Sequence, residues 1–483
     1  MIRPTTSDGP FVGRAAELAL LESAWAGRES AFIPIYGRRR IGKSELILQF
    51  TRDKRAIYHL GKVAPAQLQI REFLAEAARA LDEPLLAQLA PTDWRAAFDA
   101  IETRTKDGKL ALVLDEFQWT AGASPELPSL LQELWDRRWK RGGRIVLILC
   151  GSFIGFMERE VLGKRSPLFG RRTAQIHLQP FGYREAGLFH RRWSIENRAR
   201  AYFVCGGIPM YLKTFDEGRS LQQNIEGTLL SELAPLFREP EFLLREELRD
   251  VENYHAVLHA IAAGSTTTST LAATSGLPQR SLHYYLEQLV QLGYVARRHP
   301  LTAARPNARL VRFVLEDPLL RFWFRFVFPH RSFIQQMGPT RAYTDLIKPN
   351  LDSYFGGCFE RMCREALPSL YEAEGVHTTF RIGEYWDKRV QIDLVGVRED
   401  AWIDLGECKW GPIGSTRAVV DELETKVRGF PNVRGDTIGR RIFARTVPAS
   451  AAGRDGPTAL RWHSLESLYE DPEPRGRRGT MRT

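Results

Sequence analysis

The chain has 483 residues, 43% hydrophobic and 26% charged, and its longest apolar runs are strand-length, so we expect a cytoplasmic, multidomain protein without membrane contact. Its five cysteines are odd in number and lack a CxxC pair, which argues against both a disulfide framework and a zinc site. The formal net charge of +10 favours an anionic partner such as DNA, although an arginine-rich proteome would give the same excess.

The first chemical motif lies between a predicted strand, residues 30–36, and a predicted helix, residues 43–50. Residues 37–44 match the GxxxxGK[ST] pattern, in which backbone N–H groups of the loop and the helix start cradle phosphates. We expect Lys43 to contact the β- and γ-phosphates of ATP and Ser44 to ligate Mg2+. The nucleotide contacts predicted for this segment are Gly37, Arg40, Ile41, Gly42, Lys43, Ser44 and Glu45.

Two further apolar strands are predicted, and each ends in polar residues. The strand at residues 110–114 ends in Asp115 and Glu116, and the strand at 144–150 is followed by Ser152. Strands buried on both faces of a parallel sheet have this pattern, and ligands bind at their carboxyl ends. We expect Asp115 to hold Mg2+ through water, Glu116 to polarise the attacking water, and Ser152 to sense the γ-phosphate unless it merely forms a turn.

Arg171 follows these strands in a basic segment, where it either stabilises charge during phosphoryl transfer or belongs to a surface basic patch. Residues 9–245 resemble the archaeal-type ATPases, near the AAA+ and STAND branches of P-loop proteins. The resemblance depends on the P-loop and on Phe11-Val12-Gly13-Arg14, Leu114-Asp115-Glu116-Phe117-Gln118, Gly170-Arg171-Arg172, Pro180-Phe181 and Gly206-Gly207-Ile208-Pro209. It implies an ATPase core over residues 9–180, a helical lid over 181–248, and contacts near the adenine from Val12, Gly13 and Arg14.

Residues 249–316 have the pattern of a winged helix. Helices are predicted at 254–263, 269–274 and 279–292, and strands at 294–298 and 310–315. The third helix would face a DNA major groove, and hairpin arginines would contact phosphates. The residues concerned are Arg280, Ser281, His283, Arg297 and Arg298. Such a module also occurs in ATPases as a rigid interdomain or protein contact.

An aromatic-rich helix is predicted at residues 313–329 and overlaps a helical connector, residues 317–349. Its aromatic side chains are too closely spaced for one open face, so we interpret them as an interdomain core rather than as base-stacking groups. Beyond it, a helix at 353–367 carries Glu360, and a strand at 389–397 carries Asp393.

The next predicted strand, residues 401–410, ends in Glu407-Cys408-Lys409, with Glu407 and Lys409 on one face. Asp393 and Glu407 on adjacent strands would share one Mg2+ beside Lys409, which suits phosphodiester hydrolysis.

This arrangement, with Glu360 on the preceding helix, resembles the PD-(D/E)XK nuclease fold over residues 350–470. Gln391 departs from the pattern, because an acid is expected there. A second E-x-K at Glu424 to Lys426 is interpreted as a helical surface pair, and residues 471–483 are predicted to be disordered.

The predicted fold class is α/β: a three-layer P-loop ATPase with a parallel sheet and a helical lid, then a winged helix and an α/β restriction-endonuclease-like domain. The predicted function is ATP binding and Mg2+-dependent hydrolysis, coupled to a DNA-binding domain and a DNA nuclease domain. The alternatives are a non-cleaving, ATP-dependent regulatory or signalling switch that binds DNA or protein, and an ATPase that contacts proteins only. Oligomeric state and physiological trigger stay open.

Overall fold

The computed structural model describes residues 11–104, 108–302, 310–451 and 460–470. The chain forms two compact units, one of Met1–Pro180 with Ile208–Met210 and the other of Phe181–Gly207 with Tyr211–Thr483. The predicted disordered segment, residues 471–483, and part of the predicted hairpin, residues 303–309, lie outside the described ranges.

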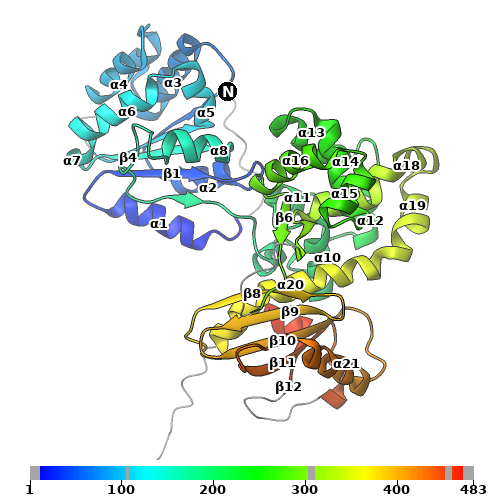
Figure 1. Cartoon of the computed structure of the whole chain (residues 1–483). Helices are drawn as coiled ribbons and strands as arrows, with labels where there is room; N and C mark the ends of the chain where they lie inside the picture. The colour runs from blue at the N-terminus through cyan, green and yellow to red at the C-terminus, as the bar shows by residue number, and fades with distance from the viewer. Residues whose placement is uncertain (1–10, 105–107, 303–309, 452–459, 471–483) are drawn as a thin grey trace, which may run out of the picture. The chain divides into compact units, whose positions relative to one another are not determined.

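The first unit is a three-layer α/β fold around a parallel five-stranded sheet of order β2-β3-β4-β1-β5. Helices α1 and α2 cover one face of the sheet, and α3, α4 and α6 cover the other (Figure 1). The strands are β1 (Ala31–Tyr36), β2 (Ala56–Leu60), β3 (Leu110–Asp115), β4 (Ile145–Gly151) and β5 (Ile176–His177). The helices include α1 (Ala15–Ala26), α2 (Lys43–Thr51), α3 (Ala66–Leu81), α4 (Trp94–Glu102), α5 (Phe117–Ala123) and α6 (Leu127–Leu134).

Burial explains the apolar runs of the central strands. Every residue of β1 and β3 is buried, as expected for parallel strands covered by helices on both faces. Alternate residues of these strands pack into one core with α3, α4 and α6. This core includes Leu112 of β3, Phe73 of α3 and Trp94 of α4. The fold class and the three strands predicted in this unit are therefore confirmed.

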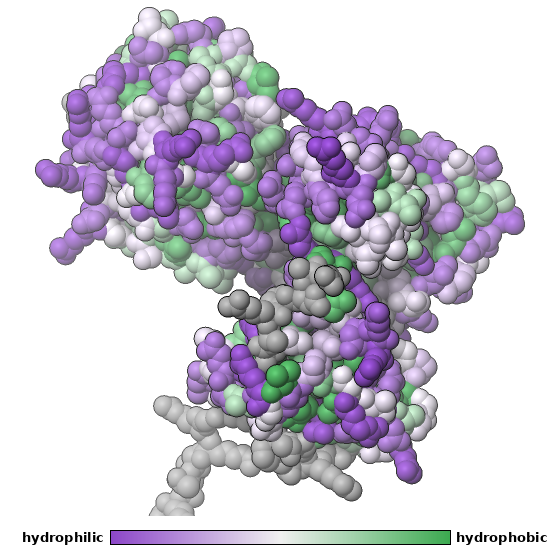
Figure 2. Space-filling model, viewed as in Figure 1, coloured by the Kyte–Doolittle hydropathy of each residue, from purple (hydrophilic) through white to green (hydrophobic). Residues whose placement is uncertain are grey.

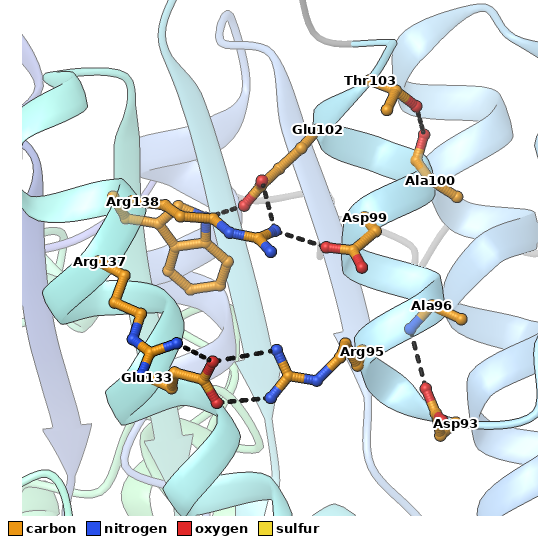
Figure 3. Close-up of polar contacts among 11 residues, drawn as sticks. Asp93, Arg95, Ala96, Asp99, Ala100, Glu102, Thr103, Glu133, Arg137 and Arg138 are labelled. Atoms are coloured by element: carbon orange, nitrogen blue, oxygen red, sulfur yellow. Dashed lines mark hydrogen bonds and ion pairs between the residues drawn. The ribbon is translucent and has the colours of Figure 1, made fainter.

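Ion pairs join α4 to α6 and to the helical turn after it, Trp135–Trp139, at the surface of the first unit (Figure 3). Arg95 pairs with Glu133, and Arg138 lies between Asp99 and Glu102. Exposed pairs of this kind each contribute less than about 1 kcal/mol, so the network aligns two helices that the apolar core already holds.

The second unit begins with helices and continues with a small three-helix and hairpin module. The first helices are α9 (Tyr183–Gly187), α10 (Ile195–Cys205), α12 (Leu221–Leu229) and α13 (Glu239–Glu247). The module consists of α14 (Val251–Ala262), α15 (Thr268–Ser275), α16 (Gln279–Gln291) and an antiparallel pair, β6 (Val295–Arg298) with β7 (Arg312–Leu315). Helices and strands thus occur in the predicted order.

The aromatic segment after the hairpin is helical and buried, but it begins later than predicted. Phe313 pairs with Arg297 in the hairpin, so the helix starts only at Pro318 with α17 (Pro318–Phe322). Trp323 and Phe324 are buried, and the Trp323 indole N–H donates to the Phe237 carbonyl at 2.7 Å, so these aromatic side chains are core, while their interdomain role stays a prediction. Two short helices follow, α18 (Arg331–Met337) and α19 (Pro339–Ala342).

The remainder of the second unit is a mixed five-stranded sheet of order β12-β11-β10-β9-β8 with a long helix before it. β9 runs antiparallel to both of its neighbours, β8 and β10, whereas β11 and β12 continue parallel to β10. The elements are α20 (Leu351–Ala373), β8 (Phe380–Trp386), β9 (Gln391–Arg398), β10 (Trp402–Lys409), α21 (Thr416–Gly429), β11 (Thr437–Ala444), β12 (Leu460–Ser464) and α22 (Leu465–Tyr469).

Among the helices of the described ranges, none combines the length and the hydropathy needed to span a bilayer. The face shown in Figure 2 is mostly hydrophilic, with hydrophobic residues scattered over it. All five cysteines carry free thiols, as predicted.

Candidate functional site

The P-loop connects the end of β1 to the start of α2, and its backbone requires glycine at two points. Gly42 adopts a left-handed φ of 90° just before α2, and a Cβ on Gly37 would lie 2.5 Å from the Leu178 carbonyl oxygen. The Lys43 ammonium donates to the carbonyl oxygens of Gly37 and Arg38, both at 2.9 Å. Burial lowers the pKa of Lys43. A lysine held by backbone carbonyls can exchange these bonds for phosphate oxygens.

Asp115 lies at the carboxyl end of β3, fully buried and held by several donors. The Ser44 hydroxyl donates to its Oδ2 at 2.7 Å, and the Tyr58 hydroxyl from β2 donates to the same oxygen. The Glu116 backbone N–H donates to Oδ1 at 2.8 Å. The predicted magnesium-binding pair, Ser44 and Asp115, is therefore adjacent, and a hydroxyl with a carboxylate suits Mg2+. Tyr58 was not predicted.

Glu116 directly precedes α5 as its N-cap residue, and two side chains fix its carboxylate. The Ser152 hydroxyl, at the end of β4, donates to Oε2 at 2.7 Å, and the Gln118 amide donates to the same oxygen. The Gln118 amide also donates to Ser152 Oγ at 3.3 Å. Because β3 and β4 are sheet neighbours, their ends bring Glu116 and Ser152 together, as the strand pattern predicted. We refer to the P-loop, Asp115, Glu116 and Ser152 as the nucleotide site.

Arg14 connects the segment before α1 to the P-loop. Its buried guanidinium donates to the carbonyl oxygens of Gln179 at 2.8 Å and Ile41 at 3.3 Å. Gly13 and Arg14 both have left-handed backbone, with φ of 68° and 60°. Arg14 therefore contacts the P-loop. The contacts of Val12, Gly13 and Arg14 with adenine stay predictions.

Arg171 is held by Asp136. Its Nε is 3.0 Å from each carboxylate oxygen and its Nη2 is 2.7 Å from Oδ2, and this pairing lowers the pKa of Asp136. Nη1 donates to the carbonyls of Pro167 and Phe169. The structure does not place Arg171 among the hydrogen bonds of the nucleotide site, and its predicted role in phosphoryl transfer stays a prediction.

The second cluster lies on β9, β10 and α20. Asp393 and Glu407 are 7% and 2% exposed, and the Cys408 backbone N–H donates to Asp393 Oδ2 at 3.0 Å. Lys409 Nζ donates to Glu407 Oε1 at 2.9 Å, which confirms that the two side chains share a face. Burial, and then the charge of Asp393, raises the pKa of Glu407 and of Glu360 to about 7. Burial also raises the pKa of Asp393.

The interpretation of the second E-x-K as a surface pair is wrong for its lysine. Lys426 Nζ, on α21, donates to Glu407 Oε2 at 2.6 Å and lies 3.2 Å from Glu422 one helical turn earlier. Glu424 pairs instead with Arg440. Val419 and Leu423 of α21 pack against the sheet, and Lys426, on the adjacent face of the helix, therefore contacts Glu407 of β10. We name Glu360, Asp393, Glu407, Lys409, Glu422 and Lys426 the carboxylate–lysine site.

In the described ranges, no three His, Cys, Asp or Glu side chains converge closely enough to form a metal cluster. The two carboxylates that we expect to ligate a cation in the carboxylate–lysine site are Asp393 and Glu407, which come from neighbouring strands. Two hard oxygen ligands suit Mg2+, which keeps several of its own waters. Gln391 is exposed and accepts a hydrogen bond from Arg312 at 3.4 Å, so it adds no charge to the site.

The third helix of the module orients its side chains as predicted. Arg280, Ser281 and His283 are exposed, whereas Leu282 and Leu286 are buried. Arg297 is exposed and pairs with Glu287. The Arg298 guanidinium lies 2.6 Å from Glu316 and 2.9 Å from Glu384 of β8, and its predicted contact with DNA stays a prediction. Arg298 connects the hairpin to the C-terminal sheet.

Comparison with known proteins adds two family matches. A family of ATPase domains found predominantly in Archaea matches residues 11–215, and a family of archaeal and bacterial proteins of unknown function matches residues 323–419. An uncharacterized protein of Methanocaldococcus jannaschii is 28% identical over 404 residues, covering 83% of this chain and 87% of the relative.

A shorter match, to an uncharacterized ATP-binding protein of the same organism, is 44% identical over 45 residues. It covers 9% of this chain and 76% of that protein. Among solved structures, a Walker-type ATPase of Pyrococcus abyssi superposes with a TM-score of 0.51 at 20% identity, covering 67% of this chain and 99% of that one. These comparisons support an archaeal-type P-loop ATPase domain in the first unit and a separate C-terminal domain.

Proposed function

We propose that the chain is a Mg2+-dependent ATPase whose nucleotide state controls a DNA-binding winged helix and a nuclease-like domain. The observation that carries the proposal is the grouping of Lys43, Ser44, Asp115 and Glu116 at one edge of a parallel sheet. These residues supply a phosphate-binding cation, a hydroxyl with a carboxylate for Mg2+, and a carboxylate for water activation.

The chain's own residues account for the hydrolytic chemistry. Lys43 exchanges the carbonyls of its loop for phosphate oxygens, while the N–H groups at the start of α2 hold the phosphates. The Glu116 carboxylate polarises the attacking water, and Ser152 and Gln118 hold that carboxylate in place. Bound Mg2+ would be held by Ser44 and Asp115 and would neutralise charge on the phosphates.

The ATPase proposal is tested by steady-state hydrolysis of ATP with and without Mg2+. Wild type is expected to hydrolyse ATP only with the metal, and Asp115→Asn to lose hydrolysis. Equal rates for wild type and Asp115→Asn would contradict the proposal. Tyr58→Phe, which removes one donor to Asp115 and leaves Ser44 in place, serves as the graded comparison.

DNA binding is proposed for the winged helix on the strength of its exposed third helix. Arg280, Ser281 and His283 project from α16 into solvent, and Arg297 adds a nearby cation at the surface. In a recognition helix, exposed polar side chains read the major groove and nearby arginines contact phosphates, and these exposed residues fit the two roles. Arg298 is omitted from the proposed interface because it pairs within the protein.

A second candidate function, metal-dependent phosphodiester hydrolysis, is favoured by the carboxylate–lysine site. Asp393 and Glu407 come from neighbouring antiparallel strands, with Lys409 beside Glu407. The order of a long helix, three antiparallel strands, a helix and two parallel strands supports a restriction-endonuclease-like fold. Mg2+ held by the two carboxylates would activate water, and Lys409 would orient the nucleophile or stabilise the transition state.

The test of this candidate is nicking of DNA with Mg2+ or Mn2+ by wild type and Lys409→Ala. Cleavage by wild type that disappears in Lys409→Ala supports the assignment. Cleavage that survives in the variant contradicts it. Salt-dependent DNA binding without cleavage under any divalent metal would favour a non-cleaving regulatory switch instead.

A further inference from the structure

Glu407 is held by two lysines, one on each carboxylate oxygen. Lys409, two residues away on the same strand, donates to Oε1 at 2.9 Å, and Lys426 of α21 donates to Oε2 at 2.6 Å. The carboxylate is 3% exposed at its side chain, so its charge is neutralised by these two ammonium groups rather than by water. A divalent cation bound to Glu407 would therefore lie close to two ammonium groups, and charge repulsion favours moving one of them away.

Lys426 has a second carboxylate within reach. Glu422 lies one helical turn earlier on α21, with its Oε1 3.2 Å from Lys426 Nζ, and its Oε2 accepts from Lys409 at 2.8 Å. Glu422 is 42% exposed at its side chain, so it lies at the solvent edge of the cluster, whereas Glu407 lies at the buried end. The long, flexible side chain of Lys426 can move from Glu407 to Glu422 without any change in the backbone.

We propose that Lys426 is a cation-displaced lysine: it holds Glu407 in the metal-free protein and moves onto Glu422 when a divalent cation binds. The inference rests on the proposed phosphodiesterase function. Lys426 moves rather than Lys409, because Lys409 lies two residues from Glu407 on the same strand while Lys426 approaches from a separate helix; Glu422 already contacts both lysines. The repulsion between the Lys426 ammonium group and a divalent cation on Glu407 drives Lys426 onto Glu422.

The test is amine acetylation of the full-length chain without nucleotide, with and without Mn2+, followed by quantitative mass spectrometry of each lysine. An amine released from a buried carboxylate reacts faster, so labelling of Lys426 is expected to rise severalfold when Mn2+ is added. Labelling of Lys409 is expected to change less than that of Lys426. Lys388, which is exposed on the β8–β9 turn, serves as the matched control and should not respond.

Mn2+ binding is measured in parallel by electron paramagnetic resonance, with Asp393→Asn to separate this site from the nucleotide site. Lys426→Met is expected to bind Mn2+ severalfold more tightly at the Asp393-dependent site, whereas Arg417→Met, a 93% exposed position on the same helix, should match wild type. Asp393-dependent binding with unchanged Lys426 labelling would overturn the inference and leave the phosphodiesterase proposal standing. The absence of any Asp393-dependent Mn2+ binding would overturn both.

Discussion

The nucleotide site and the carboxylate–lysine site both place lysine near buried carboxylates at strand ends, but their lysines have different partners. Lys43 donates to backbone carbonyls, and Asp115 accepts from the hydroxyls of Ser44 and Tyr58. In the C-terminal site Lys409 and Lys426 donate directly to Glu407. A carbonyl-bound lysine is available to a polyanion, whereas a carboxylate-bound lysine must first be displaced by another cation. The first site suits phosphate binding, and the second suits competition between cations.

Lys43→Ala tests the phosphate side of this comparison and should have the largest effect. Loss of the ammonium group removes the charge that stabilises the transferring phosphoryl group, so kcat for ATP hydrolysis is expected to fall roughly a thousandfold. Lys62→Ala, at an exposed position paired with Glu72, is the matched control and should retain wild-type activity. Comparable activity in the two variants would remove Lys43 from the mechanism.

Glu116→Gln separates hydrolysis from binding at the same site. The amide keeps the shape of the side chain but cannot act as a base, so kcat is expected to fall about a hundredfold while ATP affinity is retained. Equilibrium binding of a fluorescent ATP analogue and steady-state hydrolysis measure the two quantities. A variant that loses both together would show that Glu116 supports the site structurally rather than activating water.

The arginines of the three-helix and hairpin module offer a second contrast, between an exposed and an internally paired side chain. Arg280→Ala should weaken DNA binding roughly tenfold at low salt, because it removes an unshielded cation from α16. Arg298→Ala should instead leave DNA affinity unchanged and lower the thermal stability, since it breaks the pairs with Glu316 and Glu384. Fluorescence anisotropy over a salt series measures the DNA affinity of both variants, and calorimetry measures their thermal stability. The reverse pattern would contradict the assigned interface.

The pH dependence of stability tests the buried acids of the carboxylate–lysine site. Burial raises the pKa of Glu360 to about 7, so its proton stabilises the fold fully below about pH 4.5, and this contribution is lost as the pH rises through 7. Glu360→Gln should therefore gain about 1 kcal/mol relative to wild type at pH 8 but not at pH 5, without divalent cations. Calorimetric unfolding measures the difference. Glu372→Gln, at an exposed position of the same helix, should show no such pH dependence.

The nucleotide site could be predicted from sequence because its parts are local or follow from sheet topology. The P-loop is contiguous, and Glu116 and Ser152 meet because they end neighbouring strands. Tyr58 and Gln118 were missed because hydroxyl and amide groups are common, and only the folded backbone shows which of them meet a carboxylate.

The carboxylate–lysine site could be predicted only in part. Strand alternation predicted the contact between Glu407 and Lys409, since that rule acts over two residues. The contact between Lys426 and Glu407 depends on how α21 packs on the sheet, and helical periodicity alone does not specify that rotation. The pairing of Arg298 with Glu384 could not be predicted for a related reason, because Glu384 lies 86 residues away on another element.

The most direct test of the account is a cleavage assay on single-stranded, duplex and branched DNA with a divalent metal, with and without ATP, comparing wild type with Lys43→Ala and Asp393→Ala. We predict metal-dependent cleavage by wild type that changes with ATP, loses its ATP response in Lys43→Ala and disappears in Asp393→Ala. Cleavage that persists in Asp393→Ala, or that is unaffected by ATP on every substrate, would contradict the proposed coupling between the two sites.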